Sequence, residues 1–321
     1  MKVGFFIFIL VILGSGCRPV PVQRFQGMAL GTFYSVIYMG EEDRLLPRGV
    51  DSVLNDISSQ FSVFDSLSFI NALNRGEKIV VTPDFARVFQ ISQEVSEMTG
   101  GAFDITIGPL VEYWGFGPGQ KGDIDPVVID SLKNLVGYKK VTMENHRIIR
   151  ENDNISLNVN AVAKGFAVDK VSSFLEHQGY HDFVVDIGGE ITAKGSKNGQ
   201  PWKVGIQVPT EHKNDLAEAS YVFDLTGRSV ATSGDYRNYI EEDGIRYTHI
   251  IDPVTGYPER STLLSVSVVA DDCMTADALA TALMVLGLEK SLEFLAEHTA
   301  YAAYFIYDDQ GYRTYKTANF P

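Results

Sequence analysis

Apolar and polar residues alternate along the chain in a way that predicts a mixture of strands and helices. Strand-like runs are expected at residues 30–38, 155–159, 183–187, 229–232 and 263–270. Apolar residues at helical spacing predict helices at residues 47–57, 84–98 and 275–286, with another beginning at Asn160, a favourable N-cap residue. The two kinds of element follow one another irregularly, with hairpins among them. The sequence therefore favours a single α+β domain over a doubly wound parallel sheet.

The segment from residue 231 to residue 258 predicts a hairpin that leads into a tight turn. Residues 233–235 are expected to form a polar turn, and residues 236–240 and 245–251 to form two strands joined by a polar loop. The turn over residues 252–256 contains Pro253, which fixes φ, and Gly256, which can take a positive φ. His249 is therefore expected on a strand beside rigid backbone. A single histidine in a strand is more often structural than catalytic.

The first 17 residues have the composition of a targeting segment. Lys2 is followed by an apolar run over residues 3–13 and by small residues ending at Cys17. The run is too short for a permanent transmembrane helix. It resembles a bacterial lipoprotein signal with Cys17 as the lipidated residue, although Gly14 stands where Leu is usual. Ordinary secretion is the alternative. Residues 18–26 are then expected to be a tether, and residues 27–321 the functional domain.

Composition restricts the classes of function. The chain is 45% hydrophobic and 21% charged, as is common for globular proteins. A net charge of −14, without any concentration of basic residues, argues against nucleic acid as a partner. A polyanionic ligand would need a metal ion or backbone donors. With only Cys17 and Cys273 present, no disulfide framework is expected.

Asp277 and Thr281 are the first candidates for chemistry. They are four residues apart in an apolar helix, so both oxygens lie on one face, and a carboxylate with a hydroxyl suits Mg²⁺. On spacing alone the favoured interpretation is structural, with Asp277 serving the helix dipole and Thr281 bonding to the helix backbone. Lys164 could bind a phosphate or be an ordinary solvated lysine. The paired glycines at 100–101 and 188–189 could approach a ligand or form plain turns.

Taken together, seven short motifs occur in one order over roughly residues 25–310 and resemble the ApbE family of FAD:protein FMN transferases. The motifs lie at residues 31–32, 100–106, 161–169, 186–190, 231–236, 249–256 and 276–282. The resemblance implies an α+β domain of the T-fold-like kind that binds FAD with Mg²⁺ at its pyrophosphate. It also implies transfer of the FMN half of FAD to a Thr, or sometimes Ser, hydroxyl of a partner protein, with release of AMP.

The resemblance also assigns site residues by position. It places metal binding at Asp277, Thr281 and the backbone carbonyl of Ala161, and catalysis at His249. Asp252 could orient His249 or cap the turn. The flavin-nucleotide contacts expected from the family are Leu30, Phe64, Ala102, Phe103, Asp104, Asn158, Lys164, Ile251 and Ala280. Among these, Leu30 stands where many members have Met. Phe64 stands where an aromatic residue, often Tyr, stacks on a ring of the cofactor. Lys164 is at a position that varies between Lys and Glu.

Two other activities are compatible with the same residues. Water in place of the acceptor hydroxyl would make the protein an FAD pyrophosphatase that yields FMN and AMP. A non-catalytic FAD-binding lipoprotein is the second alternative, although storage needs no catalytic metal. For a transferase, the family implies acceptor subunits of membrane redox complexes, such as sodium-pumping NADH:quinone oxidoreductase or Rnf-type complexes. The expected location is the bacterial cell envelope, as an inner-membrane-anchored lipoprotein facing the periplasm.

Overall fold

The computed structural model describes residues 20–119, 124–207, 219–234, 239–242, 245–259 and 262–321. Cys17 and the expected lipoprotein signal lie outside these residues. Within the described part of the chain, no helix has both the length and the apolar composition needed to cross a membrane.

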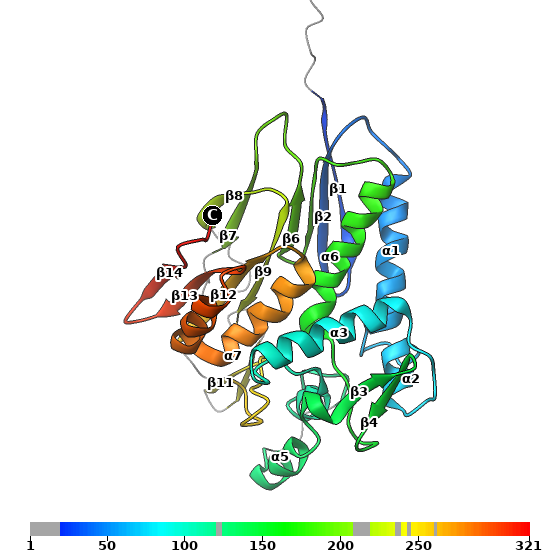
Figure 1. Cartoon of the computed structure of the whole chain (residues 1–321), viewed down its shortest axis with the longest axis vertical. Helices are drawn as coiled ribbons and strands as arrows, with labels where there is room; N and C mark the ends of the chain where they lie inside the picture. Colours follow the sequence, from blue (N-terminus) through cyan, green and yellow to red (C-terminus); the bar gives the residue numbers. More distant parts are fainter. Residues whose placement is uncertain (1–19, 120–123, 208–218, 235–238, 243–244, 260–261) are drawn as a thin grey trace, which may run out of the picture.

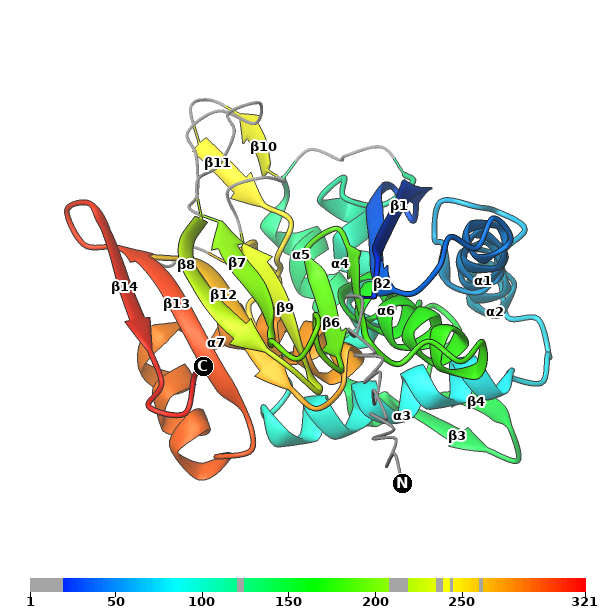
Figure 2. The same ribbon diagram turned by 90° about the horizontal axis from the view of Figure 1, so that it is seen from above.

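The centre of the protein is an eight-stranded sheet in which every neighbouring pair is antiparallel (Figures 1 and 2). Its strands, in spatial order, are β1 (Val22–Ala29), β2 (Thr32–Met39), β5 (Phe183–Ile187), β6 (Glu190–Lys194), β9 (Arg228–Gly234), β12 (Leu263–Ala270), β13 (Ala302–Asp308) and β14 (Tyr312–Lys316). Three two-stranded sheets are formed by β3 (Val141–Glu144) with β4 (Arg147–Arg150), β7 (Trp202–Gln207) with β8 (Ala219–Leu225), and β10 (Tyr239–Glu242) with β11 (Ile245–Thr248).

Helices cover one face of the large sheet (Figure 2). The helical elements are α1 (Leu46–Phe61), α2 (Phe69–Asn74), α3 (Pro83–Met98), η1 (Ile105–Ile107), α4 (Gly108–Tyr113), α5 (Pro126–Lys133), η2 (Tyr138–Lys140), α6 (Asn160–His177) and α7 (Cys273–Glu297). Successive strand residues point to opposite faces, so Val268 packs in the core beneath the helices while Val269 packs against the β7–β8 layer. The predicted α+β fold is confirmed.

The N-terminal hairpin begins earlier than the sequence suggested. Strand β1 starts at Val22, so residues 22–26, expected to be tether, belong to the sheet; their alternating exposure lets Phe25 pack against the core. The strand expected over residues 30–38 starts at Thr32 instead. Leu30 and Gly31 form the β1–β2 turn with φ of 51° and 73°, the positive values that a two-residue hairpin turn requires.

The prediction of a strand at residues 155–159 is wrong, although these residues do alternate between buried and partly buried. Their backbone is held by other partners: Leu157 exchanges two hydrogen bonds with the Asn74 side chain, at 2.8 and 2.9 Å, and the Asn158 N–H donates to the Ile105 carbonyl. The segment is extended but joins no sheet. Asn160 is also not the N-cap, because it is the first residue of α6 and its own N–H donates to Asn158 Oδ1 at 3.0 Å.

The segment from residue 231 to residue 258 forms the predicted hairpin with shifted boundaries. Strand β9 continues through Gly234, so residues 233–234 pair with β12 rather than turning, and Asp235 lies outside the described residues. Strands β10 and β11 pair as predicted, but β11 ends at Thr248 and His249 follows it. The main chain then closes a tight turn, since the Asp252 N–H donates to the Tyr257 carbonyl and the Gly256 N–H to the Asp252 carbonyl.

The remaining predicted elements are present in the structure, and some of them are longer than predicted. Strands β5 and β12 have the expected bounds, and helix α3 ends at Met98 as predicted. Gly100 and Gly101 terminate α3 with hydrogen bonds back to the Glu97 and Ser96 carbonyls, and both have positive φ. Helix α7 extends beyond the expected residue 286, across a non-helical Gly287, to Glu297.

Candidate active site

Two turns and the end of one strand lie at one end of the large sheet. We call this region the turn edge (residues 30–31, 188–190 and 233–234). The Gly188 N–H donates to the Phe33 carbonyl at 3.0 Å, so the β5–β6 turn lies against the β1–β2 hairpin. Gly188 and Gly189 have φ of 70° and 106°, which explains the paired glycines. Because β9 is antiparallel to β6, Ser233 at the end of β9 lies at the same edge as Glu190.

Helix α7 brings the two expected metal-binding side chains to this region. Asp277 is 3% exposed, and its Oδ2 accepts a hydrogen bond from the Gly165 N–H of α6 at 2.9 Å. The Thr281 Oγ1 lies 3.0 Å from the Ser233 Oγ, which places Thr281 at the turn edge. Ser233 was not identified from the sequence as a site residue, although it lies inside one of the motifs.

The structure argues against the purely structural interpretation of Asp277. The start of α7 already has two carboxylates: the Asp272 side chain accepts from the Thr275 N–H, and the Asp169 carboxylate accepts from the Cys273 and Met274 N–H groups. These groups satisfy the helix end and its dipole. Asp277 is therefore a buried carboxylate whose presence the helix terminus does not explain.

A second buried carboxylate lies beside Lys164. Glu190, at the start of β6, is 1% exposed, and its Oε1 is 2.5 Å from the Lys164 Nζ. Lys164 is therefore ion-paired, not merely solvated. Burial raises the pKa of Glu190 and of Asp277, while the Lys164 ammonium opposes both shifts. Two buried acids thus lie near one ammonium, and a cation bound beside them would stabilise their ionised forms.

A pocket of about 420 Å³ opens next to the start of α6. It is lined by Val63, Phe64, Ser66, Asn71, Asn74, Arg75, Gly108, Val111, Glu112, Gly117, Pro118, Ser156, Leu157 and Asn158. Two expected flavin contacts are among these residues: Phe64, which is 64% exposed, and Asn158. The size is within the range of small-molecule sites.

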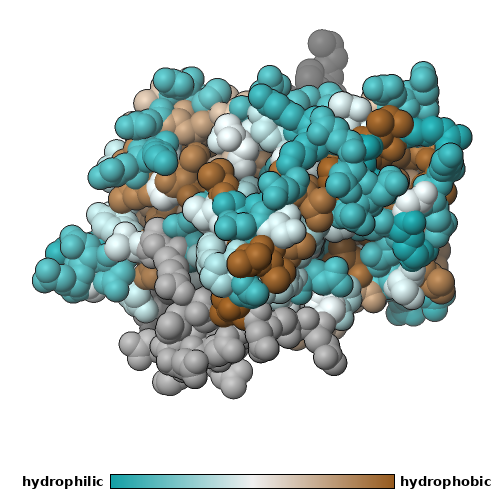
Figure 3. Space-filling view, turned by 90° about the horizontal axis from the view of Figure 1, so that it is seen from below, coloured by the Kyte–Doolittle hydropathy of each residue, from teal (hydrophilic) through white to brown (hydrophobic). Residues whose placement is uncertain are grey.

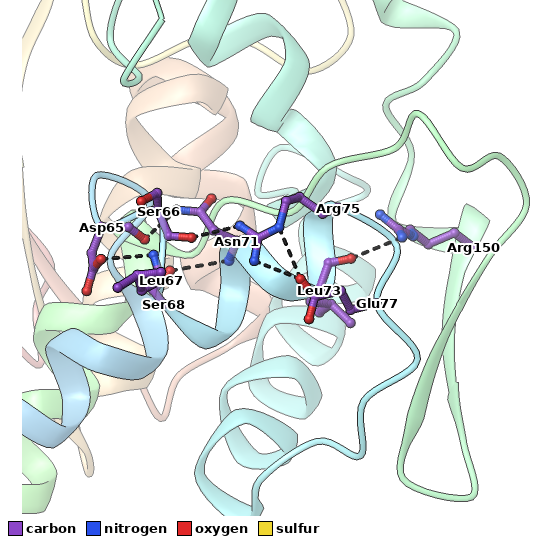
Figure 4. A network of polar contacts seen from close by, with 9 residues as sticks. All are labelled: Asp65, Ser66, Leu67, Ser68, Asn71, Leu73, Arg75, Glu77 and Arg150. Carbon is purple, nitrogen blue, oxygen red and sulfur yellow. Dashed lines mark hydrogen bonds and ion pairs between the residues drawn. The ribbon is translucent and has the colours of Figure 1, made fainter.

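Asn71 in α2 and Arg75, the C-cap residue of α2, hold the loop around Asp65 and Ser66, which follows Phe64 (Figure 4). The Asn71 Nδ2 donates to the carbonyls of Val63 and Asp65, at 2.8 Å each, and the Arg75 Nη1 donates to the Ser66 carbonyl at 2.7 Å. The other wall is fixed by the Asn74 bonds to Leu157 already described. These hydrogen bonds make the pocket a preformed feature. Asn71, Asn74 and Arg75 belong to no recognisable sequence motif and were not predicted as site residues.

His249 is linked to the pocket through the segment after α4. The His249 ring meets the Phe116 ring edge-on, with the ring centroids 6.4 Å apart, and the next two residues, Gly117 and Pro118, line the pocket. The turn after His249 is anchored by the Trp114 Nε1, which donates to the Gly256 carbonyl at 2.9 Å. The face of the protein that is seen from below Figure 1 has hydrophobic patches among hydrophilic side chains (Figure 3).

Asp252 has a visible structural role. Its Oδ1 accepts a hydrogen bond from the Val254 N–H at 2.8 Å. The carboxylate therefore caps the turn, which was one of the two roles expected for it.

Five other expected flavin contacts have side chains that are at most 8% exposed, namely Ala102, Phe103, Asp104, Ile251 and Ala280. The Asp104 carboxylate accepts from both the N–H and the hydroxyl of Thr106, and burial raises its pKa. None of the five is part of the described pocket lining. These residues are buried as a whole, main chain included, so in this structure they pack in the core or support a turn. Leu30 in the turn edge and Ala161 on α6 are partly buried.

Comparison with known proteins gives one consistent result. The model of the ApbE family matches residues 30–305. The FAD:protein FMN transferases of Vibrio cholerae and Haemophilus influenzae are 32% and 34% identical to this chain, covering 97% and 94% of it and 95% and 92% of those proteins. The solved flavin transferase ApbE from Vibrio cholerae superimposes with a TM-score of 0.85 at 31% identity, covering 94% of this chain and 99% of that one.

A second solved structure, the apo form of Pseudomonas stutzeri flavinyl transferase ApbE, has a TM-score of 0.82 at 33% identity, with 94% and 96% of the two chains covered. These relatives are enzymes. The similarity runs along nearly the whole length of each protein, in agreement with the ordered motifs of the sequence. The chain belongs to the ApbE family.

Proposed function

We propose that this protein transfers the FMN half of FAD to a Thr or Ser hydroxyl of an acceptor protein, with Mg²⁺, and releases AMP. The observation that carries the proposal is the buried Asp277 carboxylate beside the Thr281–Ser233 hydroxyl pair, in a member of the ApbE family. A buried carboxylate in the neighbourhood of a second one needs a compensating charge. Binding of a phosphate-bearing substrate together with a cation supplies that charge.

The donor set fits Mg²⁺. Among the described residues, no group of three or more His, Cys, Asp or Glu could hold a metal ion by itself. Mg²⁺ uses one or two carboxylates and takes its other ligands from water and substrate phosphates. Asp277, Thr281 and the Ala161 carbonyl would hold it, and Ser233 supports Thr281 through the hydroxyl contact. A bound Mg²⁺ would supply positive charge to the phosphate oxygens during transfer.

The pocket offers a place for one ring system of FAD. Phe64 presents an exposed aromatic side chain at its wall, as stacking on a planar ring requires. From Asn158 in the pocket the chain leads within two residues into α6, which carries Ala161 and Lys164. A nucleotide that extends from the pocket along the start of α6 would bring its pyrophosphate toward Asp277.

In the proposed reaction, the acceptor hydroxyl oxygen bonds to the phosphorus of the FMN moiety, and the bond from that phosphorus to the bridging oxygen breaks. The bridging oxygen leaves with AMP. His249 accepts the hydroxyl proton on a neutral imidazole nitrogen. The Asp252 carboxylate supports the adjacent turn.

The test measures the mass of a candidate acceptor subunit after incubation with FAD, Mg²⁺ and the protein, with AMP quantified in parallel. The acceptor should gain the FMN mass, and acceptor Thr→Ala should abolish labelling because the attacking hydroxyl is gone. His249→Ala should reduce transfer by roughly 10²- to 10⁴-fold with FAD affinity little changed. Equal AMP release with and without acceptor, and no gain in mass, would identify a pyrophosphatase instead.

We also propose, from the sequence of residues 1–17, that Cys17 is lipidated and anchors the protein to the inner membrane, facing the periplasm. Acceptor subunits of sodium-pumping NADH:quinone oxidoreductase or Rnf-type complexes would be accessible from that location. Cys17→Ser should move the protein out of the membrane fraction, because several acyl chains together anchor firmly. Extraction of most wild-type protein without detergent would contradict the anchor.

A further inference from the structure

The two side chains of the ion pair between α6 and β6 differ in their exposure to solvent. Glu190 is 1% exposed, whereas the Lys164 side chain is 34% exposed, and the two are joined at 2.5 Å. The carboxylate therefore lies inside the protein, and the lysine side chain reaches it from the open side. The N–H of Gly165, the residue after Lys164, bonds to the Asp277 carboxylate, and Lys164 and Asp277 attract each other electrostatically, so the ammonium lies in the neighbourhood of a second carboxylate.

One carboxylate oxygen of Glu190 is left without a hydrogen bond in the described part of the chain. This oxygen, Oε2, is buried. A buried acceptor without a partner lowers stability, and a buried ion pair contributes little stability once desolvation is counted. Stability of the fold is therefore a poor explanation for a glutamate at this position.

The same helix and strand contain a second ion pair that serves for comparison. The Lys194 Nζ of β6 is 2.7 Å from the Glu176 Oε1 of α6, and these side chains are 37% and 36% exposed. This pair joins the other ends of α6 and β6, away from the turn edge. Helix α6 and strand β6 can thus be linked by charge at the surface, without burial of a carboxylate.

We infer that Glu190 is a positioning residue that holds the Lys164 ammonium beside Asp277, where it faces the pyrophosphate of bound FAD. The inference rests on the proposed function. Free lysine side chains occupy many rotamers, so an ammonium that is fixed in advance interacts more strongly with charge that develops on the phosphates. Glu190 acts through Lys164 and touches neither the acceptor nor the reacting phosphorus.

The first test is a double-mutant cycle of Glu190→Gln, Lys164→Gln and the double variant, with Glu176→Gln as the matched control. Each single variant should lower kcat for FMN transfer by roughly 10- to 100-fold. The double variant should be no slower than the slower single variant, because both changes remove one function. The control should match wild type. Wild-type kcat in Glu190→Gln, or a further loss of rate when it is added to Lys164→Gln, would overturn the inference.

The second test exchanges the charges, as Lys164→Glu with Glu190→Lys. This variant should recover the stability that Lys164→Gln loses by leaving the buried Glu190 carboxylate without its partner, but not the transfer rate, because the ammonium then projects from β6 instead of α6. Recovery of both would show that the pair is only structural.

Affinity for FAD, measured by flavin fluorescence with EDTA present, gives a readout that does not require catalysis. Lys164→Gln and Glu190→Gln should weaken it equally, by roughly 5- to 10-fold, and the exchanged pair should weaken it further. Equal affinity in wild type and Glu190→Gln would also count against positioning. If wild type transfers no FMN, the proposed function fails, and this affinity comparison still decides the role of Glu190.

Discussion

At the scale of single residues, Asp277 is the side chain on which the proposed chemistry depends most. It is buried, and the start of its helix is capped by other carboxylates. Asp277→Asn keeps the shape but removes the charge, so Mg²⁺ should no longer raise the melting temperature and Mg²⁺-dependent turnover should be lost. Without metal, the variant should be at least as stable as wild type, because burial disfavours the carboxylate charge.

Thermal unfolding with and without Mg²⁺ measures this effect, and Asp271→Asn, at a solvent-exposed aspartate six positions earlier, is the control. An unchanged Mg²⁺-induced shift in Asp277→Asn would show that the metal binds elsewhere.

The sequence paired the candidate site residues that are close along the chain and missed those that meet only through distant contacts. Asp277 and Thr281 could be paired because they are one helical turn apart. Ser233 is 48 residues from Thr281, and Asn74 is 83 residues from the Leu157 backbone that it holds. A single sequence gives no signal for such pairs. The motifs contained Ser233 and Glu190, but only the fold shows what these side chains contact.

At the scale of elements, the crossing of α6 and α7 fixes the position of Asp277. Gly165 of α6 lies directly against α7, and a Cβ at this position would overlap the Cys273 carbonyl. Gly165→Ala should therefore push the helices apart and destabilise the protein by about 1–3 kcal/mol, despite the better helix propensity of alanine. Metal affinity should fall as well, because the Gly165 N–H bonds to Asp277.

Urea unfolding measures the change, with Ser173→Ala on the exposed side of α6 as a control that should stay within about 0.5 kcal/mol of wild type. A Gly165→Ala variant as stable as wild type would mean that the two helices can separate without loss.

Helices and strands with one buried face could be predicted from the sequence. Segments whose backbone is hydrogen-bonded by side chains, instead of by a neighbouring strand, could not. Helix α3 and strand β12 have clear periodicity and were placed nearly to the residue. Residues 155–159 alternate like a strand, yet their hydrogen bonds go to Asn74 and to Ile105. Alternating apolar residues indicate which side chains are buried. They do not determine which groups form hydrogen bonds with the backbone N–H and C=O groups.

At the scale of the whole molecule, the buried acids should make stability depend on pH. Burial raises the pKa of Asp104, Asp169, Asp186, Glu190 and Asp277 in the folded state. For Asp169 the pKa rises from 3.8 to about 7, against the effect of its two hydrogen bonds from α7. The folded protein then holds more protons than the unfolded chain between these values, so the free energy of unfolding should fall as pH rises from about 4 to about 7.

Urea unfolding of the metal-free protein across this range measures the slope, and Asp169→Asn should reduce it because one of the shifted groups is gone. Stability that increases from pH 5 to pH 7 would contradict the prediction, since the carboxylates would then be stabilised in their charged form. Added Mg²⁺ should make the fall smaller, because a cation beside Asp277 favours the ionised carboxylate and binds only the folded state.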